Sequence, residues 1–221
     1  MNVLLAVLWK DLTIEWRSRD RVVAMVVFSL LVVMVFHLSL PGGATGATRD
    51  TAPGLLWIAY IFAALLGLGR SFSLELENDA VSGLALAPSD RGWVFLGKAI
   101  ANWIILSAVQ VVTALVFALV FELDLAAVAG RLAAVVALAS VGLCAIGTLS
   151  AAVAVRTRFR EVMLPLLMLP LLWPLLSAAV RATQQLLIDG SVAFAPIQFL
   201  IVTDGIYLIV SFLVFEYVLD E

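Results

Sequence analysis

Six long apolar runs, separated by short polar segments, dominate this 221-residue chain. Lipid offers no partner for free backbone N–H and C=O groups, so a segment that crosses a bilayer needs about 20 mainly apolar residues folded as a helix. The runs that meet this requirement cover residues 22–40, 53–69, 99–121, 132–155, 162–180 and 196–219. The sequence therefore predicts an all-α integral membrane protein, with six transmembrane helices in a single membrane domain over residues 1–221.

Composition supports this class and argues against several functions. Apolar residues make up 64% of the chain and charged residues 13%, whereas soluble domains average about 45–50% and about 25%. The net charge of −3 is too small to imply a nucleic-acid partner. With one cysteine, Cys144, and one histidine, His37, the chain has no internal disulfide and no multi-histidine metal site. We expect no metal or cofactor bound directly.

Basic residues divide unevenly between the two sets of loops. Four precede the first span, and six lie in the loops after the second and fourth spans. The loops after the first, third and fifth spans hold three. Because Lys and Arg collect on the cytoplasmic side of membrane proteins, we expect both termini to be cytoplasmic.

An amphipathic helix is predicted over residues 3–17. Its apolar residues recur at three- and four-residue spacing and include Trp9 and Trp16, while Lys10, Asp11 and Glu15 lie mostly elsewhere on the helical wheel. Such a helix lies in the membrane plane with its tryptophans at headgroup level. The alternative is that the first span begins early, but a span does not cheaply hold three charged side chains.

The longest segment outside the spans, residues 70–98, carries the most functional information. It is too short for a catalytic domain, so the energy for any transport must come from another chain or from an ion gradient. An acidic stretch is followed by a Ser-Gly break, a short apolar helix over residues 84–87 and a proline. We interpret residues 75–98 as a cytoplasmic coupling segment that docks on a soluble partner through Glu75, Glu77, Asp79, Ser82, Gly83, Pro88, Arg91 and Lys98.

Residues 92–99 nearly match the phosphate-binding pattern GxxxxGK[ST], but we reject that interpretation. Ala99 stands where a hydroxyl residue would hold magnesium, and the intervening residues are bulky and apolar. The segment also leads into a membrane helix without a preceding strand. Lys98 is instead expected to end a cytoplasmic loop and to anchor the third span by snorkelling.

Several of these features together resemble a known family. The segment at residues 75–98 looks like the coupling segment of type-2 ABC exporter permeases. The likeness lies in its order of residues: an acidic stretch, Ser-Gly, Leu, Ala-Pro, Arg and Gly-Lys. Within that superfamily, the whole chain resembles the haem exporter B subunit (CcmB) of cytochrome c maturation. The more specific likeness is the sequence APGLLW at residues 52–57, together with the acidic loop that ends in Gly97-Lys98. Chain length, the N-terminal amphipathic helix and the proline-rich fifth span also match.

The resemblance implies a membrane subunit, without an ATPase site of its own, in a bacterial inner membrane. It implies a dimeric ATP-binding partner subunit that carries the ATP, a haem-handling membrane subunit, a small accessory membrane subunit and a haem chaperone, with haem as possible cargo. In that scheme the ATPase moves the coupling segment, and the second and third spans shift with it. A permease for a polysaccharide, lipid or drug, or a non-transporting scaffold of a haem-handling complex, are the alternatives.

Two polar residues within or beside the apolar runs have open interpretations. An ionised carboxylate inside hydrocarbon costs several kcal/mol, so Asp204 in the sixth run indicates a role in the translocation path or in subunit pairing. If the run starts near Thr203, Asp204 lies instead at the outer surface. His37, near the outer end of the first span, is a conceivable haem ligand, although an ordinary interfacial histidine is the simpler interpretation.

The remaining candidates concern packing and the cargo route. Trp57, Tyr60 and Trp103 are expected either to line a lateral path for a flat apolar substrate or to anchor the spans at the interface. Small residues repeat at four-residue spacing in the fourth span, at Ser140, Cys144, Thr148 and Ala152, and predict close helix packing. Pro165, Pro170 and Pro174 predict either a hinge or a fixed kink in the fifth span.

Overall fold

A computed structural model describes residues 3–40, 46–72, 91–123, 125–155, 157 and 159–220. All regular secondary structure within these ranges is helical. Six helices of the described chain are long and apolar enough to cross a membrane. They are α2 (Asp20–Ser39), α3 (Gly46–Gly69), α6 (Arg91–Val120), α7 (Ala129–Val155), α8 (Arg160–Asp189) and α9 (Phe194–Asp220). The prediction of an all-α protein with six membrane-spanning helices is confirmed.

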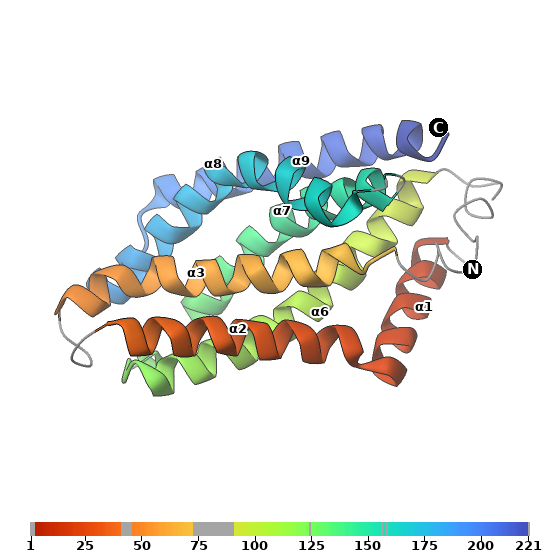
Figure 1. Cartoon of the computed structure of the whole chain (residues 1–221). Coiled ribbons are helices and arrows are strands. Elements are labelled where there is room, and N and C mark those ends of the chain that lie inside the picture. Colours follow the sequence, from red (N-terminus) through yellow and green to blue (C-terminus); the bar gives the residue numbers. More distant parts are fainter. Residues whose placement is uncertain are drawn as a thin grey trace.

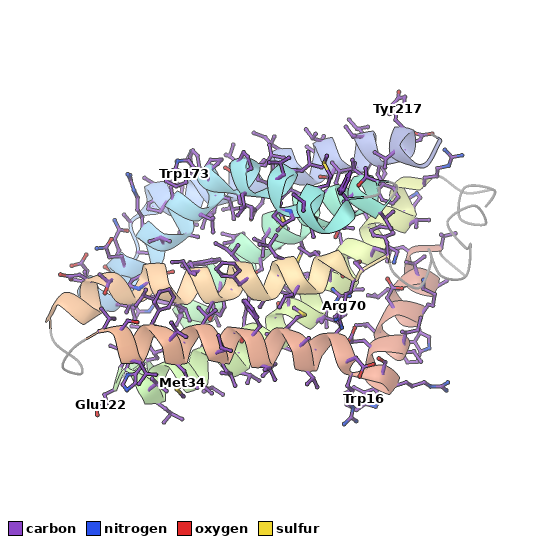
Figure 2. All side chains as sticks on the ribbon, viewed as in Figure 1. Trp16, Met34, Arg70, Glu122, Trp173 and Tyr217 are labelled. Atoms are coloured by element: carbon purple, nitrogen blue, oxygen red, sulfur yellow. The ribbon has the colours of Figure 1, made fainter. Side chains whose placement is uncertain are left out.

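The six helices run side by side, and both chain ends lie at the same end of the bundle (Figure 1). We call this the α1 end, after helix α1 (Val3–Ser18). The opposite end holds the short helix η1 (Ala126–Val128) and is called the η1 end. Figure 2 places Trp16 at the first of these ends and Glu122 at the second. An even number of crossings brings the two termini together.

Several helices extend beyond the apolar runs that predicted them. Helix α6 begins at Arg91 rather than at residue 99, and α8 continues to Asp189 rather than ending at residue 180. Helix α3 begins at Gly46 and contains Pro53. The predicted spans stop at charged residues such as Lys98 and Arg181, so the helical turns beyond these residues escape the prediction.

Helix α1 is separated from α2 by a sharp change of direction (Figure 1). Arg19 makes the turn with φ of 57°, a left-handed conformation that non-glycine residues adopt at a cost of about 1 kcal/mol. Helix α1 then packs across the start of α6. Trp9 and Trp16 are each 76% exposed. Helix α1 covers the residues 3–17 that were expected to be helical, and its position in the membrane plane stays a prediction.

Helix α7 occupies the centre of the bundle and packs against α3, α6, α8 and α9. The small-residue stripe is fully enclosed, with Ser140, Cys144, Thr148 and Ala152 all buried. Gly147 shows why small residues are needed, because a Cβ atom there would overlap the side chain of Leu68 on α3. The prediction that this stripe serves helix packing fits this arrangement.

Helix α8 continues without interruption through its three prolines. The Tyr207 hydroxyl on α9 donates a hydrogen bond to the Leu171 carbonyl, within the proline-containing stretch. A side chain of the neighbouring helix therefore holds α8 there. This contact favours a fixed geometry over a free hinge.

Candidate coupling site at the α1 end

The predicted coupling segment is described only in part. Residues 73–90 lie outside the described residues, and with them the predicted positions Glu75, Glu77, Asp79, Ser82, Gly83 and Pro88. The structure does describe the two ends of this segment: Ser71 and Phe72, where the chain leaves α3, and Arg91 to Lys98, where it enters α6. The candidate site is built from these two ends.

Lys98 lies inside α6 and is buried, with 1% of its surface exposed. Its Nζ atom is 3.1 Å from Asp11 Oδ2 on α1 and donates to the Ser71 carbonyl at 3.0 Å. The same ammonium lies 4.5 Å from the centroid of the Phe72 ring. The expectation that Lys98 snorkels from a loop is therefore wrong. A buried ammonium needs such partners, because an unpaired charge away from water costs several kcal/mol.

Gly97, which precedes Lys98, allows helix α1 to approach α6 closely. A Cβ atom at this position would lie 2.9 Å from the Leu4 carbonyl oxygen and 3.0 Å from Val7 Cβ. Both of these atoms belong to α1. The glycine thus lets α1 approach α6 closely, and the following lysine pairs with Asp11. The near match to a phosphate-binding loop is a helix-docking sequence.

A second set of polar contacts surrounds Asn102, which is 2% exposed and lies one turn further along α6. Its Nδ2 atom donates to Ser71 Oγ at 3.0 Å and to Thr148 Oγ1 on α7 at 2.9 Å. Its Oδ1 atom accepts a hydrogen bond of 2.7 Å from Arg21 on α2. A buried amide with donors and acceptors all engaged rigidifies its surroundings.

We call these residues the α1-end polar cluster: Asp11, Arg21, Ser71, Lys98, Asn102 and Thr148. They come from α1, α2, the turn after α3, α6 and α7. The cluster therefore joins both ends of the 73–90 segment to three further helices. The contacts that join them are about 3 Å long.

The start of α6 is also held by α9. Arg91 Nη1 donates to the Glu216 carbonyl at 3.3 Å, near the C-terminal end of α9. Trp93 packs edge-on against Phe212, with 6.3 Å between ring centroids. Arg91 was predicted to face a partner protein, and in the structure it also binds the last turns of α9. Its coupling role stays a prediction.

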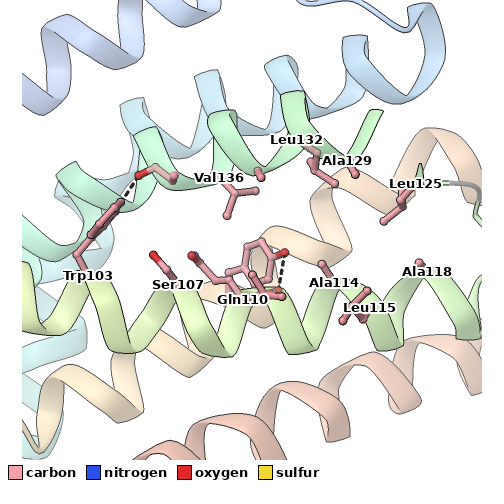
Figure 3. A pocket seen from close by; sticks show the side chains of 14 residues that line it. Trp103, Ser107, Gln110, Ala114, Leu115, Ala118, Leu125, Ala129, Leu132 and Val136 are labelled. Atoms are coloured by element: carbon pink, nitrogen blue, oxygen red, sulfur yellow. Dashed lines mark hydrogen bonds between the residues drawn. The ribbon is translucent and has the colours of Figure 1, made fainter. Parts of the chain in front are cut away.

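The four residues expected on a translocation path do not share one cavity. Tyr60 and Trp103 line a groove of about 380 Å³ between α6 and α7 (Figure 3). Trp57 is buried between α3 and α8, where its Nε1 atom donates to Thr183 Oγ1 at 3.0 Å. Asp204 contacts Gly142, on the face of α7 opposite to the groove. The structure thus separates Asp204 from the aromatic residues.

Asp204 is buried, with 4% of its surface exposed. Because α9 begins at Phe194, the carboxylate lies about 15 Å inside the helix. Neither carboxylate oxygen has a hydrogen-bond partner among the described residues. A Cβ atom at Gly142 would overlap the carboxylate, so glycine makes the space for it. The alternative of a surface position for Asp204 is wrong.

His37 lies at the η1 end of α2 and is exposed. Its ring packs edge-on against Phe121, with 5.6 Å between centroids. This contact with one aromatic ring fits the interfacial interpretation. A role as haem ligand stays a prediction.

Sequence reasoning missed five members of the α1-end polar cluster: Asp11, Arg21, Ser71, Asn102 and Thr148. Asp11 was assigned to the polar face of an amphipathic helix, where a charge needs no further explanation. Asn102 carried a usable signal, because a polar amide three residues inside a predicted span requires a partner. Its partners lie 31, 46 and 81 residues away in the sequence, so the sequence did not identify them.

Comparison with known proteins places this geometry in a family context. The family model described as CcmB protein matches residues 2–216. Heme exporter protein B of Paracoccus denitrificans is 30% identical over 180 residues, covering 81% of this chain and 82% of the relative. The same-named protein of Rhodobacter capsulatus is 33% identical over 77% of this chain and 78% of the relative. That of Bradyrhizobium diazoefficiens is 26% identical over 96% and 94%.

Proposed function

The chain belongs to the CcmB protein family, and from that premise we propose that it is the membrane subunit of a haem exporter that serves cytochrome c maturation. The supporting observation is the family match over nearly the whole chain, together with relatives named heme exporter protein B. In this proposal the subunit spans the bacterial inner membrane with both termini in the cytoplasm. The α1 end is then the cytoplasmic end.

Power for the exporter comes from a separate ATP-binding subunit, present as a dimer. It docks on the coupling segment through Glu75, Glu77, Asp79, Ser82, Gly83, Pro88 and Arg91. Lys98 takes part in coupling without touching the ATP-binding subunit, because its ammonium is buried against Asp11 and Ser71. The coupling surface and the α1-end polar cluster thus have different tasks: the first receives the force and the second distributes it.

The proposed power stroke follows from which elements the cluster joins. Closure of the ATPase dimer displaces the coupling segment and, with it, the turn after α3 and the start of α6. Helix α1 moves with them, because Lys98 and Gly97 fasten it to α6. Helices α6 and α7 then change their separation towards the η1 end, where the groove lies. Conformations with different outward access result.

Sister subunits complete the complex: a haem-handling membrane subunit, a small accessory membrane subunit and a haem chaperone on the outer side. Haem is the cargo or the molecule released. Asp204 is the residue that we assign to pairing or to the cargo path, because a buried carboxylate in a span marks function more often than packing.

Co-purification from the native host tests this function. Mass spectrometry should identify an ATP-binding subunit and the sister membrane subunits with the chain, and the visible absorption spectrum should report haem. Replacing Pro88 or Arg91 with alanine should lower the stimulation of ATPase activity and the yield of cytochrome c, while the protein still inserts into the membrane. Unchanged ATPase rates and cytochrome c yields in both variants would contradict the coupling role.

A further inference from the structure

The groove between α6 and α7 has a shape and chemistry that suit a different ligand from haem. We propose that it binds one hydrocarbon chain of a membrane phospholipid. The headgroup of that lipid lies at the η1 end. Only the assignment of this end to the outer leaflet rests on the proposed function; the groove itself does not.

The dimensions of the groove match a single chain. Its lining follows α6 from Trp103 to Ala118, a helical rise of about 22 Å. A cavity of about 380 Å³ along this length is much smaller than the roughly 2,000 Å³ that a helix of the same length occupies. A transmembrane helix, with a diameter of about 10–12 Å, is far too wide for it. The occupant is therefore a thin, extended chain.

Both the depth and the opening of the groove suit a chain that enters from lipid. One leaflet contributes about 15 Å of hydrocarbon, so a groove of this length reaches the middle of the bilayer from one surface. Val111 and Leu115 form its rim and are 58% and 62% exposed. The groove thus opens sideways onto the surface where lipid lies. Trp103 and Leu125 mark its two ends (Figure 3).

The lining is apolar, and most of its polar groups are already engaged. Tyr60 donates to the Gln110 carbonyl at 3.2 Å, and Trp103 Nε1 donates to the Ala137 carbonyl at 2.9 Å. The Gln110 side chain is 2.8 Å from Ser140 Oγ. Ser107 Oγ is the lining side-chain atom that has no partner among the described residues. An uncharged chain that makes no hydrogen bonds fits such walls.

The described lining of the groove lacks the side chains that bind haem. Among the lining residues that the structure describes there is no His, Cys or Met to ligate iron, and no Lys or Arg to pair with a propionate. The one phenol, Tyr60, already donates its hydrogen bond to a backbone carbonyl. The groove is accordingly a lipid site, and haem handled by the complex takes another route.

Photolabelling tests the proposal. The full-length chain is reconstituted in nanodiscs of phosphatidylethanolamine that contain a trace of the same lipid with a diazirine in one acyl chain, and adducts are mapped by mass spectrometry. We expect adducts to concentrate on residues 103–118 of α6 and 129–137 of α7. Ala114→Phe should lower adduct formation there by about tenfold, because a phenyl ring fills the narrow groove and excludes the chain.

Two further variants distinguish blocking of the groove from misfolding of the protein. Ala108→Phe places the same ring on an exposed position of α6 and should leave labelling unchanged. Ala118→Phe blocks the groove near its η1 end and replaces Ala114→Phe if that variant does not fold. Three results would overturn the proposal: equal labelling of every exposed helix, unaltered labelling in the blocked variants, or displacement of the label by added haem. None of these readouts needs the ATPase, so they do not depend on the proposed function.

Discussion

Helices α6 and α7 meet in two different ways at the two ends of the bundle. At the α1 end, Asn102 bonds directly to Thr148, and the same amide holds the turn after α3 and helix α2. Towards the η1 end, a groove of about 380 Å³ lies between the two helices, which Gln110 and Ser140 still join across it. The α1-end polar cluster therefore acts as a clamp on this pair of helices, and the groove separates part of the same pair nearer the other end.

In the proposed power stroke, this difference would let a small displacement at the α1 end become a larger one at the η1 end. A helix fixed at one end and poorly packed at the other pivots, so its far end moves more than its near end. Close-packed interiors resist such movement, whereas a groove offers room for it. The stability of variants at the two ends shows whether the clamp is as strong as its contacts indicate.

The largest effect is expected from Lys98→Met. The substitution removes the buried ammonium from the Ser71 carbonyl and from Asp11, which keeps its exposed contact with Lys10. Breaking a buried ion pair by removing one member costs about 3–5 kcal/mol. Because Asp11 keeps Lys10, the expected loss lies near the lower end of this range. Thermal unfolding of the purified protein in detergent should show a midpoint lowered by about 10 °C, since a chain of this size shifts by about 2–4 °C per kcal/mol.

Lys10→Met provides a matched control, because Lys10 pairs with the same Asp11 at 2.9 Å. The side chain of Lys10 is 42% exposed, against 1% for Lys98. Exposed pairs contribute at most about 1 kcal/mol. Equal losses in the two variants would mean that Asp11 alone, and not the buried position of Lys98, holds α1 in place.

Asn102→Leu should have the next largest effect. Its amide contacts three side chains, from Arg21, Ser71 and Thr148. Hydrogen bonds between helices in membranes average about 0.6 kcal/mol each, so the loss should be about 2 kcal/mol. Gln110→Leu, beside the groove, breaks the contact with one side chain, Ser140, and should cost about 0.6 kcal/mol. Similar melting temperatures for both variants would remove the distinction between the two regions.

The sequence predicted the helices better than it predicted the clamp. Apolar runs fix the number of spans, and three- and four-residue spacing reveals α1, because both patterns are local. Lys98 was misplaced since hydropathy starts the third span at residue 99, whereas α6 begins at Arg91 and carries the lysine inside. Its partner Asp11 is 87 residues away in the chain. A contact of that range depends on how helices pack, and no periodicity encodes it.

Asp204 illustrates the same limit within one helix. The sequence left two positions open for this carboxylate, because the start of the sixth span was uncertain. The structure starts α9 at Phe194 and presents Asp204 to Gly142 of α7. In the sequence, Gly142 is one residue of an apolar run, and nothing near it in the chain indicates why a glycine is needed there. Only the packing of α9 on α7 shows that it makes room for a carboxylate.

Gly97→Ala tests the close approach of α1 to the clamped end of α6. The new Cβ atom would lie 2.9 Å from the Leu4 carbonyl oxygen, so α1 must shift. Overpacking costs about 1–3 kcal/mol and alanine regains about 1 kcal/mol of helix propensity, which leaves a net loss of about 1 kcal/mol. Gly54→Ala in α3 has open space around its Cβ atom and should instead raise the melting temperature. A gain in both variants would show that α1 is not tightly docked.

Ser107→Ala should have the smallest effect and separates the two regions most directly. Ser107 Oγ is buried beside the groove and has no hydrogen-bond partner among the described residues. The substitution removes a polar atom that has no hydrogen-bond partner among the described residues. The free energy of unfolding should therefore stay the same or rise by at most about 1 kcal/mol, and the melting temperature should follow it. Ser71→Ala makes the same chemical change in the clamp, where Ser71 Oγ bonds to Asn102 at 3.0 Å, and should destabilise the protein. A loss of stability in Ser107→Ala equal to that in Ser71→Ala would mean that the groove has a polar partner for this hydroxyl. The unpaired hydroxyl of Ser107 would then no longer distinguish the groove from the α1-end polar cluster.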